Sequence, residues 1–86
     1  MAGDFDAFGA VRDAVAVVCE VEPDSLTRAT RFDDLAADSL ARVSIADVLE
    51  ASVLTRAHRS MHINDASLGR IESLGELTDY VLAGVD

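Results

Sequence analysis

The chain has 86 residues, half of them hydrophobic, and 16 acidic against 7 basic residues give a formal net charge of −9 at pH 7. A chain of this length builds one small core, which excludes most enzyme architectures and predicts a single domain over residues 1–86. An acidic surface repels phosphate backbones and anionic lipids, so we expect neither nucleic acid nor membrane as a partner.

Residues 4–19 are predicted to form an amphipathic helix. Apolar side chains recur there at spacings of three and four and share one stripe: Phe5, Phe8, Val11, Val15 and Val18. Glu20, Glu22 and Pro23 are expected to end the helix, because proline disfavours helical geometry in the residue before it.

The same segment bears on cellular location. Its single cysteine, Cys19, cannot form an internal disulfide and is expected to be a buried, inert thiol in a reducing compartment. Asp4 and Asp6 stand where a secretory leader would be positively charged. The longest apolar stretch, residues 14–19, is far shorter than the ~20 residues of a membrane span. We therefore expect a cytoplasmic protein.

A long and mostly polar connection follows over residues 21–38. A loop of this length in a compact domain needs anchors, and its apolar residues Leu26, Phe32 and Leu35 are the expected ones. The pair Asp24-Ser25 could start a single helical turn.

A second helix is predicted from Ser39 to Val53, with Asp38 as its N-cap. At ~100° per residue, the expected core face occupies one arc of about 140°. Its members are Ala41, Ile45, Val48, Leu49 and Val53. Leu40 and Asp47 fall on the opposite side and Val43 at the flank, which suggests a contact surface, although single exposed apolar residues are also common.

The remaining segments complete an all-α prediction with three main helices and one short helix. Residues 54–62 are the one locally basic segment, expected as a connection that tucks Leu54 and Met61 into the bundle. A short helix is predicted over 65–71. The last helix should start at Ser73 with a Ser73–Glu76 capping box and end at Gly84. Its predicted apolar stripe consists of Leu74, Leu77, Tyr80 and Val81.

An Asp-Ser-Leu triplet at the start of the second helix follows a Phe-x-x-Leu loop end within residues 32–40. Through these residues the chain resembles the acyl carrier protein family. Further segments match in the same order: 21–32 is similar to the family's first loop, 49–50 to its second helix and 63–81 to its third and fourth helices. The resemblance covers nearly the whole chain and implies a small four-helix carrier-protein bundle.

In that family a separate phosphopantetheinyl transferase attaches a 4′-phosphopantetheine arm to the serine through a phosphodiester. The resemblance therefore implies that Ser39 carries the arm. Independently, a serine in the first helical turn projects where free N–H groups and the positive end of the dipole favour a phosphate. Ser25 lies in a second Asp-Ser-Leu, but Pro23 precedes it and no apolar helical stripe follows, so we interpret it as a loop residue. A plain exposed serine is the alternative at Ser39.

The resemblance implies a discrete, non-catalytic acyl carrier protein that holds acyl intermediates as thioesters in polyketide or fatty-acid-type biosynthesis. The sequence Asp-Ser-Leu-Ala is more similar to polyketide carriers than to those of housekeeping fatty-acid synthesis. The expected partners of this monomer are the transferase and acyl-transferring, synthase and tailoring enzymes with basic docking patches. The expected docking residues are Asp38, Leu40, Val43, Asp47 and Glu50.

The chain departs from the family pattern in three places. A glycine often stands two residues before the triplet, where this chain has alanines at 36 and 37; alanine should be tolerated if the backbone there needs no positive φ. Arg42 and Ser44 replace residues that are usually acidic. The 54–62 segment is longer than the usual connection. Its charges are either merely solvated or in contact with an acidic partner or with the phosphate of the arm.

Other functions remain as alternatives. His58, His62 and Asp65 have spacings that could suit a metal ion, but solvated loop histidines are commoner, and no metal site is expected. A Ser39-based hydrolase would lack a cleft and an oxyanion hole, so no catalytic residue is expected. A peptidyl carrier protein of a nonribosomal pathway and an unmodified helical interaction domain stay open.

Overall fold

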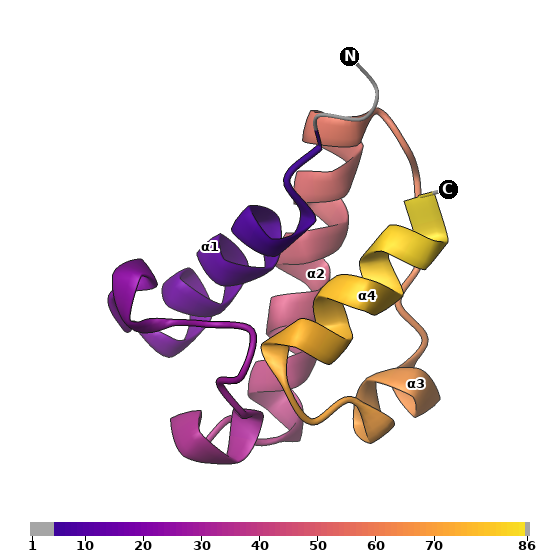
Figure 1. Ribbon diagram of the computed structural model, residues 1–86. Helices are drawn as coiled ribbons and strands as arrows, with labels where there is room; N and C mark the ends of the chain where they lie inside the picture. The colour runs from indigo at the N-terminus through magenta and orange to yellow at the C-terminus, as the bar shows by residue number, and fades with distance from the viewer. Residues whose placement is uncertain (1–4, 86) are drawn as a thin grey trace.

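The computed structural model describes residues 5–85, without the side chain of Val85, and they form a small helical bundle (Figure 1). Its helices are α1 (Ala7–Cys19), α2 (Ser39–Ala57), α3 (Asp65–Arg70) and α4 (Leu74–Val85), and the first loop holds two 3-10 turns, η2 (Pro23–Ser25) and η3 (Phe32–Leu35). No strand occurs among these residues, and Arg31 and Ser73 form an isolated bridge. The all-α prediction with three longer helices and one short helix is confirmed.

Helix α1 starts later than predicted and ends as predicted. The Asp6 carboxylate accepts a hydrogen bond from the Gly9 N–H at 2.9 Å, and this cap fixes the start at Ala7; Asp4 lies outside the described residues. The helix ends after Cys19 because Glu20 adopts a left-handed conformation, with φ 56° and ψ 48°. The predicted stripe faces the core, with Val11 and Val15 fully buried and its other members partly buried.

Helix α2 runs four residues beyond the predicted end, to Ala57, where His58 turns left-handed. The extra turn is stabilised from outside the helix, because Arg56 Nη2 lies 3.1 Å from the Asp13 carboxylate of α1. The prediction that residues 54–57 form a connection is therefore wrong. Leu54 does not tuck into the bundle but is 56% exposed, whereas Met61 is partly buried as expected.

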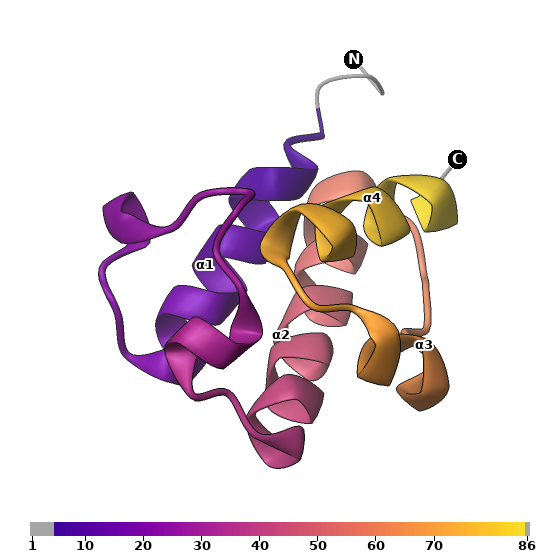
Figure 2. The ribbon, with the colours of Figure 1, turned by 60° about the horizontal axis from the view of Figure 1, so that its bottom comes forward.

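The core lies where α1 packs against both α2 and α4 (Figures 1 and 2). Of the predicted α2 core face, Ile45, Leu49 and Val53 are fully buried. The prediction that Val48 lies in the core is wrong, because its side chain is 37% exposed. Ala46 is buried instead, since the buried face of α2 centres on Leu49. Two of the predicted loop anchors, Leu26 and Phe32, are buried and Leu35 is partly buried.

The first loop is paired with the residues that lead into α4 (Figure 2). The N–H groups of Leu74 and Gly75 donate to the carbonyls of Thr30 and Arg28, each at 2.9 Å, and the Phe32 N–H donates to the Glu72 carbonyl at 3.0 Å. A Cβ on Gly75 would lie 3.0 Å from the Arg28 carbonyl oxygen, so a side chain at this position would push against the backbone of the first loop. These bonds fix the loop that precedes α2.

The C-terminal helices differ from prediction in detail. Helix α3 begins at Asp65 as predicted. The Ser73 hydroxyl accepts from the Glu76 N–H at 3.2 Å, but the Glu76 carboxylate accepts from the N–H of Glu72 rather than that of Ser73, so the capping box is displaced by one residue. Gly84 does not end α4, which continues to Val85. A Cβ at Gly84 would lie 2.8 Å from the Met61 methyl group, so the glycine makes room for that side chain.

Candidate functional site

Ser39 is the first residue of α2, and its side chain is exposed. Asp38 is the N-cap, as predicted: its carboxylate accepts from the Ala41 N–H at 2.8 Å, and its carbonyl accepts from the Arg42 N–H at 3.0 Å. The N–H groups of Ser39 and Leu40 precede those of Ala41 and Arg42 along the helix and lie nearer the positive end of its dipole. The structure thus places a solvent-facing hydroxyl beside backbone donors that favour an anion.

The chain enters this site through a left-handed residue. Ala36 has φ 54° and ψ 34° as it leaves η3. The N–H groups of Ala36 and Ala37 donate to the carbonyls of Asp33 at 3.2 Å and Phe32 at 3.1 Å. A side chain with a Cβ costs roughly 1–2 kcal/mol in this conformation. The condition on which alanine would be tolerated, a backbone without positive φ, is not met, so Ala36 stands where the backbone favours glycine.

Arg42 braces the first turn of α2 against two neighbouring segments. Its Nη1 donates to the Ile71 carbonyl at 3.0 Å and, less closely, to the Leu68 carbonyl at 3.4 Å. The guanidinium carbon also lies 4.8 Å from the centre of the buried Phe32 ring. Arg42 therefore connects the helix start to η3 and to the end of α3. The sequence analysis noted Arg42 only as replacing a residue that is usually acidic in the family, and it missed these contacts.

The predicted docking residues fall into two groups. Leu40 and Val43 are 75% and 40% exposed, and Asp38 and Asp47 are exposed as well. Glu50 is half-buried, because its Oε2 accepts from the Ile63 N–H at 2.7 Å. That carboxylate ties the loop after α2 to the helix, and a docking role for it stays a prediction.

The second Asp-Ser-Leu segment has a different setting. Ser25 ends the three-residue turn η2, and its hydroxyl donates to the Glu22 carbonyl at 2.7 Å. The next residue, Leu26, is extended and buried, so no helix follows Ser25. The predicted single turn is present, although it begins at Pro23.

Other chemical groups lie apart from Ser39. Within residues 5–85 no three His, Cys, Asp or Glu side chains come close enough to hold a metal ion, so His58, His62 and Asp65 form no such group. Cys19 is partly buried, and this burial raises the pKa of its thiol. No helix in the described part of the chain is both long and apolar enough to cross a bilayer.

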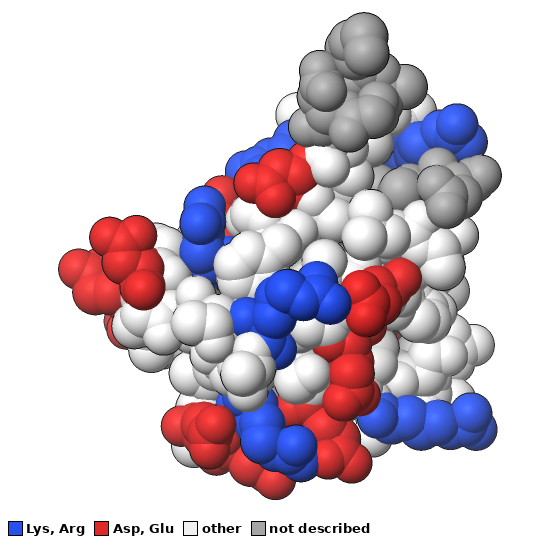
Figure 3. All heavy atoms as spheres, viewed as in Figure 1, with Lys and Arg blue, Asp and Glu red and all other residues white. Residues whose placement is uncertain are grey.

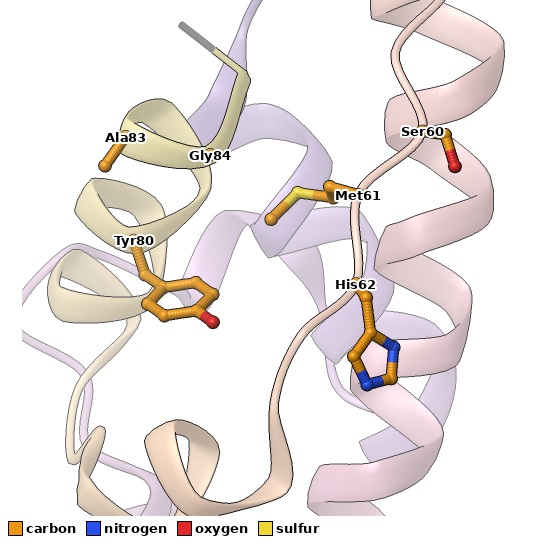
Figure 4. A pocket seen from close by; sticks show the side chains of 6 residues that line it. All are labelled: Ser60, Met61, His62, Tyr80, Ala83 and Gly84. Carbon is orange, nitrogen blue, oxygen red and sulfur yellow. The ribbon is translucent and has the colours of Figure 1, made fainter.

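A shallow hollow lies between the loop after α2 and the C-terminal half of α4 (Figure 4). It is lined by Ser60, Met61, His62, Tyr80, Ala83 and Gly84. Met61 points into it toward Tyr80, whereas His62 turns away (Figure 4). The hollow is formed by residues remote in sequence from Ser39 and contains no member of the site.

A small helical bundle that presents an exposed serine at the capped start of its longest helix is the architecture of a carrier domain. A family model for the phosphopantetheine attachment site matches residues 9–81. The chain belongs to this phosphopantetheine-binding family, whose domain carries 4′-phosphopantetheine covalently, and the family resemblance is confirmed. No curated protein is significantly similar to the chain.

Proposed function

We propose that Ser39 is the residue to which 4′-phosphopantetheine is attached and that residues 1–86 act as one acyl carrier domain. The observation that carries the proposal is the placement of Ser39, exposed at the first position of α2 directly after its capping aspartate. The hydroxyl of Ser25 supports the choice by contrast, since it bonds a carbonyl within a short turn.

The residues around Ser39 suit a phosphodiester. The dipole of α2 and the N–H groups of its first turn favour negative charge at this point, and the Asp38 carboxylate is turned to the Ala41 N–H as the cap. Arg42 and Phe32 hold the turn against α3 and η3. When bound, the arm supplies a terminal thiol for thioester linkage, and the protein supplies an exposed and fixed attachment point.

The chain acts in this proposal as a carrier and not as a catalyst. The partners are the phosphopantetheinyl transferase and the enzymes that load, extend or modify the acyl group. Asp38, Leu40, Val43 and Asp47 are exposed at or near Ser39 and form the proposed docking face, with Glu50 at its edge. The lone cysteine supports a reducing, cytoplasmic location, and the strong net negative charge supports a monomer.

We further propose that the acyl group belongs to a polyketide or fatty-acid-type pathway. The Asp-Ser-Leu-Ala sequence at residues 38–41 supports the polyketide choice. A peptidyl carrier of a nonribosomal pathway is the nearest alternative, and loading assays with acyl and aminoacyl donors on the modified protein separate the two.

The attachment site is tested by intact-mass measurement after co-expression with a phosphopantetheinyl transferase. The unaltered protein and Ser25→Ala should gain the mass of one phosphopantetheine, and Ser39→Ala should gain none. Circular dichroism should show the same helix content in all three proteins, because both serines are exposed. Modification lost only in Ser25→Ala contradicts the assignment. An unmodified wild-type protein favours the helical interaction domain.

A further inference from the structure

The hollow between the loop after α2, residues 58–64, and the C-terminal half of α4 has a volume of about 400 Å³ (Figure 4). Met61 and Tyr80, which are partly buried, give it an apolar base. The other residues that line it are all exposed: Ser60, His62, Ala83 and Gly84. A pocket for a small molecule buries roughly 70–90% of its ligand, which so open a hollow does not do. Its shape suits a single side chain that projects from another protein.

Both walls of the hollow belong to segments without acidic residues. All 16 Asp and Glu residues lie outside residues 54–64 and 80–85, and the first of these segments contains two arginines and both histidines of the chain. In Figure 3 acidic side chains gather over the first loop and the first half of α4, whereas the surface beside the second half of α4 is mostly uncharged. An acidic partner therefore meets little repulsion from the walls of the hollow.

Acidic side chains of the neighbouring elements are engaged elsewhere. Glu50 Oε2 accepts from the Ile63 N–H at 2.7 Å and lies 3.5 Å from His62 Nδ1. The His62 ring turns away from the hollow, so this carboxylate lies outside it (Figure 4). Asp79 pairs with Arg28 at 2.9 Å. Neither carboxylate lines the hollow.

Arg59 places a positive charge at the edge of the hollow. It is exposed, and it directly precedes the lining residue Ser60. Arg56, one turn earlier, pairs with Asp13 at 3.1 Å. At an ionic strength of ~0.15 M, charges more than about 8 Å apart are largely screened from each other. Arg59 therefore acts on a bound partner more strongly than the distant acidic groups do, and charge complementarity favours an acidic partner.

The hollow lies at the opposite end of α2 from Ser39. A helix of 19 residues is about 28 Å long, and the loop that forms one wall follows its last residue, Ala57. Residues 58–62 of this loop also belong to the segment by which the chain departs from the family pattern. A second copy of the chain is disfavoured as the occupant, because two proteins with a net charge of −9 repel each other.

We propose that the hollow is a docking site for a partner protein that places one apolar side chain, flanked by acidic residues, against Met61 and Tyr80. The flexible thioether of Met61 adapts to apolar side chains of different shape, as methionine does at many binding surfaces. The contact holds the protein at the end remote from Ser39. This partner and an enzyme that acts at Ser39 therefore bind at the same time.

The probes are short peptides of sequence Asp-Glu-X-Glu-Asp, in which X is leucine, methionine or phenylalanine. They are added to isotope-labelled protein at ~0.15 M salt, and binding is followed by NMR. Amide signals of residues 58–62 and 80–84 should shift, with a Kd of about 1 mM for the best peptide. The same peptide with serine as X should bind at least about tenfold more weakly, because the apolar side chain is lost.

Two variants act on the hollow and its charge. In Gly84→Ala the new Cβ would lie 2.8 Å from the Met61 methyl group, the flexible end of that side chain, so Met61 is displaced and Kd should rise about tenfold. Arg59→Ser should raise Kd about threefold, because the charge at the rim is lost. Arg70→Ser removes the same charge at an exposed position at the end of α3 and should leave Kd unchanged. The pair Arg59→Ser and Arg70→Ser decides the question without altering the packing.

The proposal is overturned if none of the apolar peptides shifts these amide signals at about 5 mM, or if the serine peptide binds as tightly. Equal Kd values for Arg59→Ser and Arg70→Ser also overturn it. A dimer in sedimentation measurements that Gly84→Ala dissolves assigns the hollow to a second copy instead.

Simultaneous binding is tested by phosphopantetheine attachment in the presence of saturating peptide. The rate of attachment should not change, and a rate that falls as the peptide saturates the hollow overturns docking at the end remote from Ser39. Peptide binding itself is measured on the unmodified protein, so a failed attachment at Ser39 is seen independently of the hollow.

Discussion

Replacement of Arg42 by alanine should destabilise the bundle far more than replacement of another arginine on the same helix. Arg42 donates to the Ile71 and Leu68 carbonyls and lies over the Phe32 ring, so the variant removes contacts to both α3 and η3. Arg56 also forms a bond across elements, to Asp13, but both side chains of that pair are 43% exposed. The two variants compare a braced arginine with an exposed ion pair.

The contacts set the expected size of the effect. A hydrogen bond from a charged donor contributes roughly 1.5–3 kcal/mol, and a cation–π contact adds about 0.5–1 kcal/mol. Arg42 is only partly buried, so screening by solvent places its loss near the lower end, at about 2 kcal/mol. For a domain of this size that lowers Tm by roughly 8–16 °C. Arg56→Ala should cost at most about 0.5 kcal/mol.

Urea unfolding followed by far-UV circular dichroism measures both losses. Arg42→Lys serves as an intermediate variant, because lysine keeps the charge but lacks the planar guanidinium that lies over the Phe32 ring. We expect the free energy of unfolding to fall in the order wild type, Arg56→Ala, Arg42→Lys, Arg42→Ala. If Arg42→Ala and Arg56→Ala lose the same free energy, the bracing role is refuted.

Two further predictions concern local backbone and thiol chemistry. Ala36→Gly should raise the free energy of unfolding by about 0.5–1 kcal/mol, because glycine adopts the left-handed conformation without the strain of a Cβ. Ala37 has no positive φ, so Ala37→Gly should lower the free energy of unfolding by a similar amount. Thermal unfolding measures both variants, and a loss of stability in Ala36→Gly would contradict the strain. Burial raises the pKa of the Cys19 thiol, so at mildly alkaline pH the folded protein holds less thiolate than the unfolded chain. Iodoacetamide should therefore alkylate Cys19 more slowly in the folded protein than in the chain unfolded by urea. Equal rates would show that the thiol is not shielded.

The sequence pattern was sufficient where local periodicity determines structure. The end of α1, the cap at Asp38 and the burial of Val11, Val15, Ile45 and Leu49 all follow from spacing and capping chemistry. The family match over residues 9–81 extends the prediction to a phosphopantetheine-binding domain, because the matching segments lie in order along the chain.

Features that depend on distant partners could not be predicted in the same way. The last turn of α2 is held by an arginine whose partner, Asp13, lies 43 residues earlier. Glu50 occupies a position that periodicity leaves near the surface, yet its length lets it reach the Ile63 N–H. The positive φ of Ala36 is invisible to periodicity because it is a property of the turn and not of the side chain.

The pairing of the first loop with the start of α4 sets an order for folding during synthesis. Arg28 and Gly75, which meet in this pairing, are 47 residues apart in the chain. A ribosome produces α2 and Ser39 well before the residues that fix the preceding loop, and contacts of such separation form late. The first loop, which leads into Ser39, therefore reaches its native conformation only after α4 has been synthesised. A nascent chain thus exposes Ser39 before its docking surface is complete.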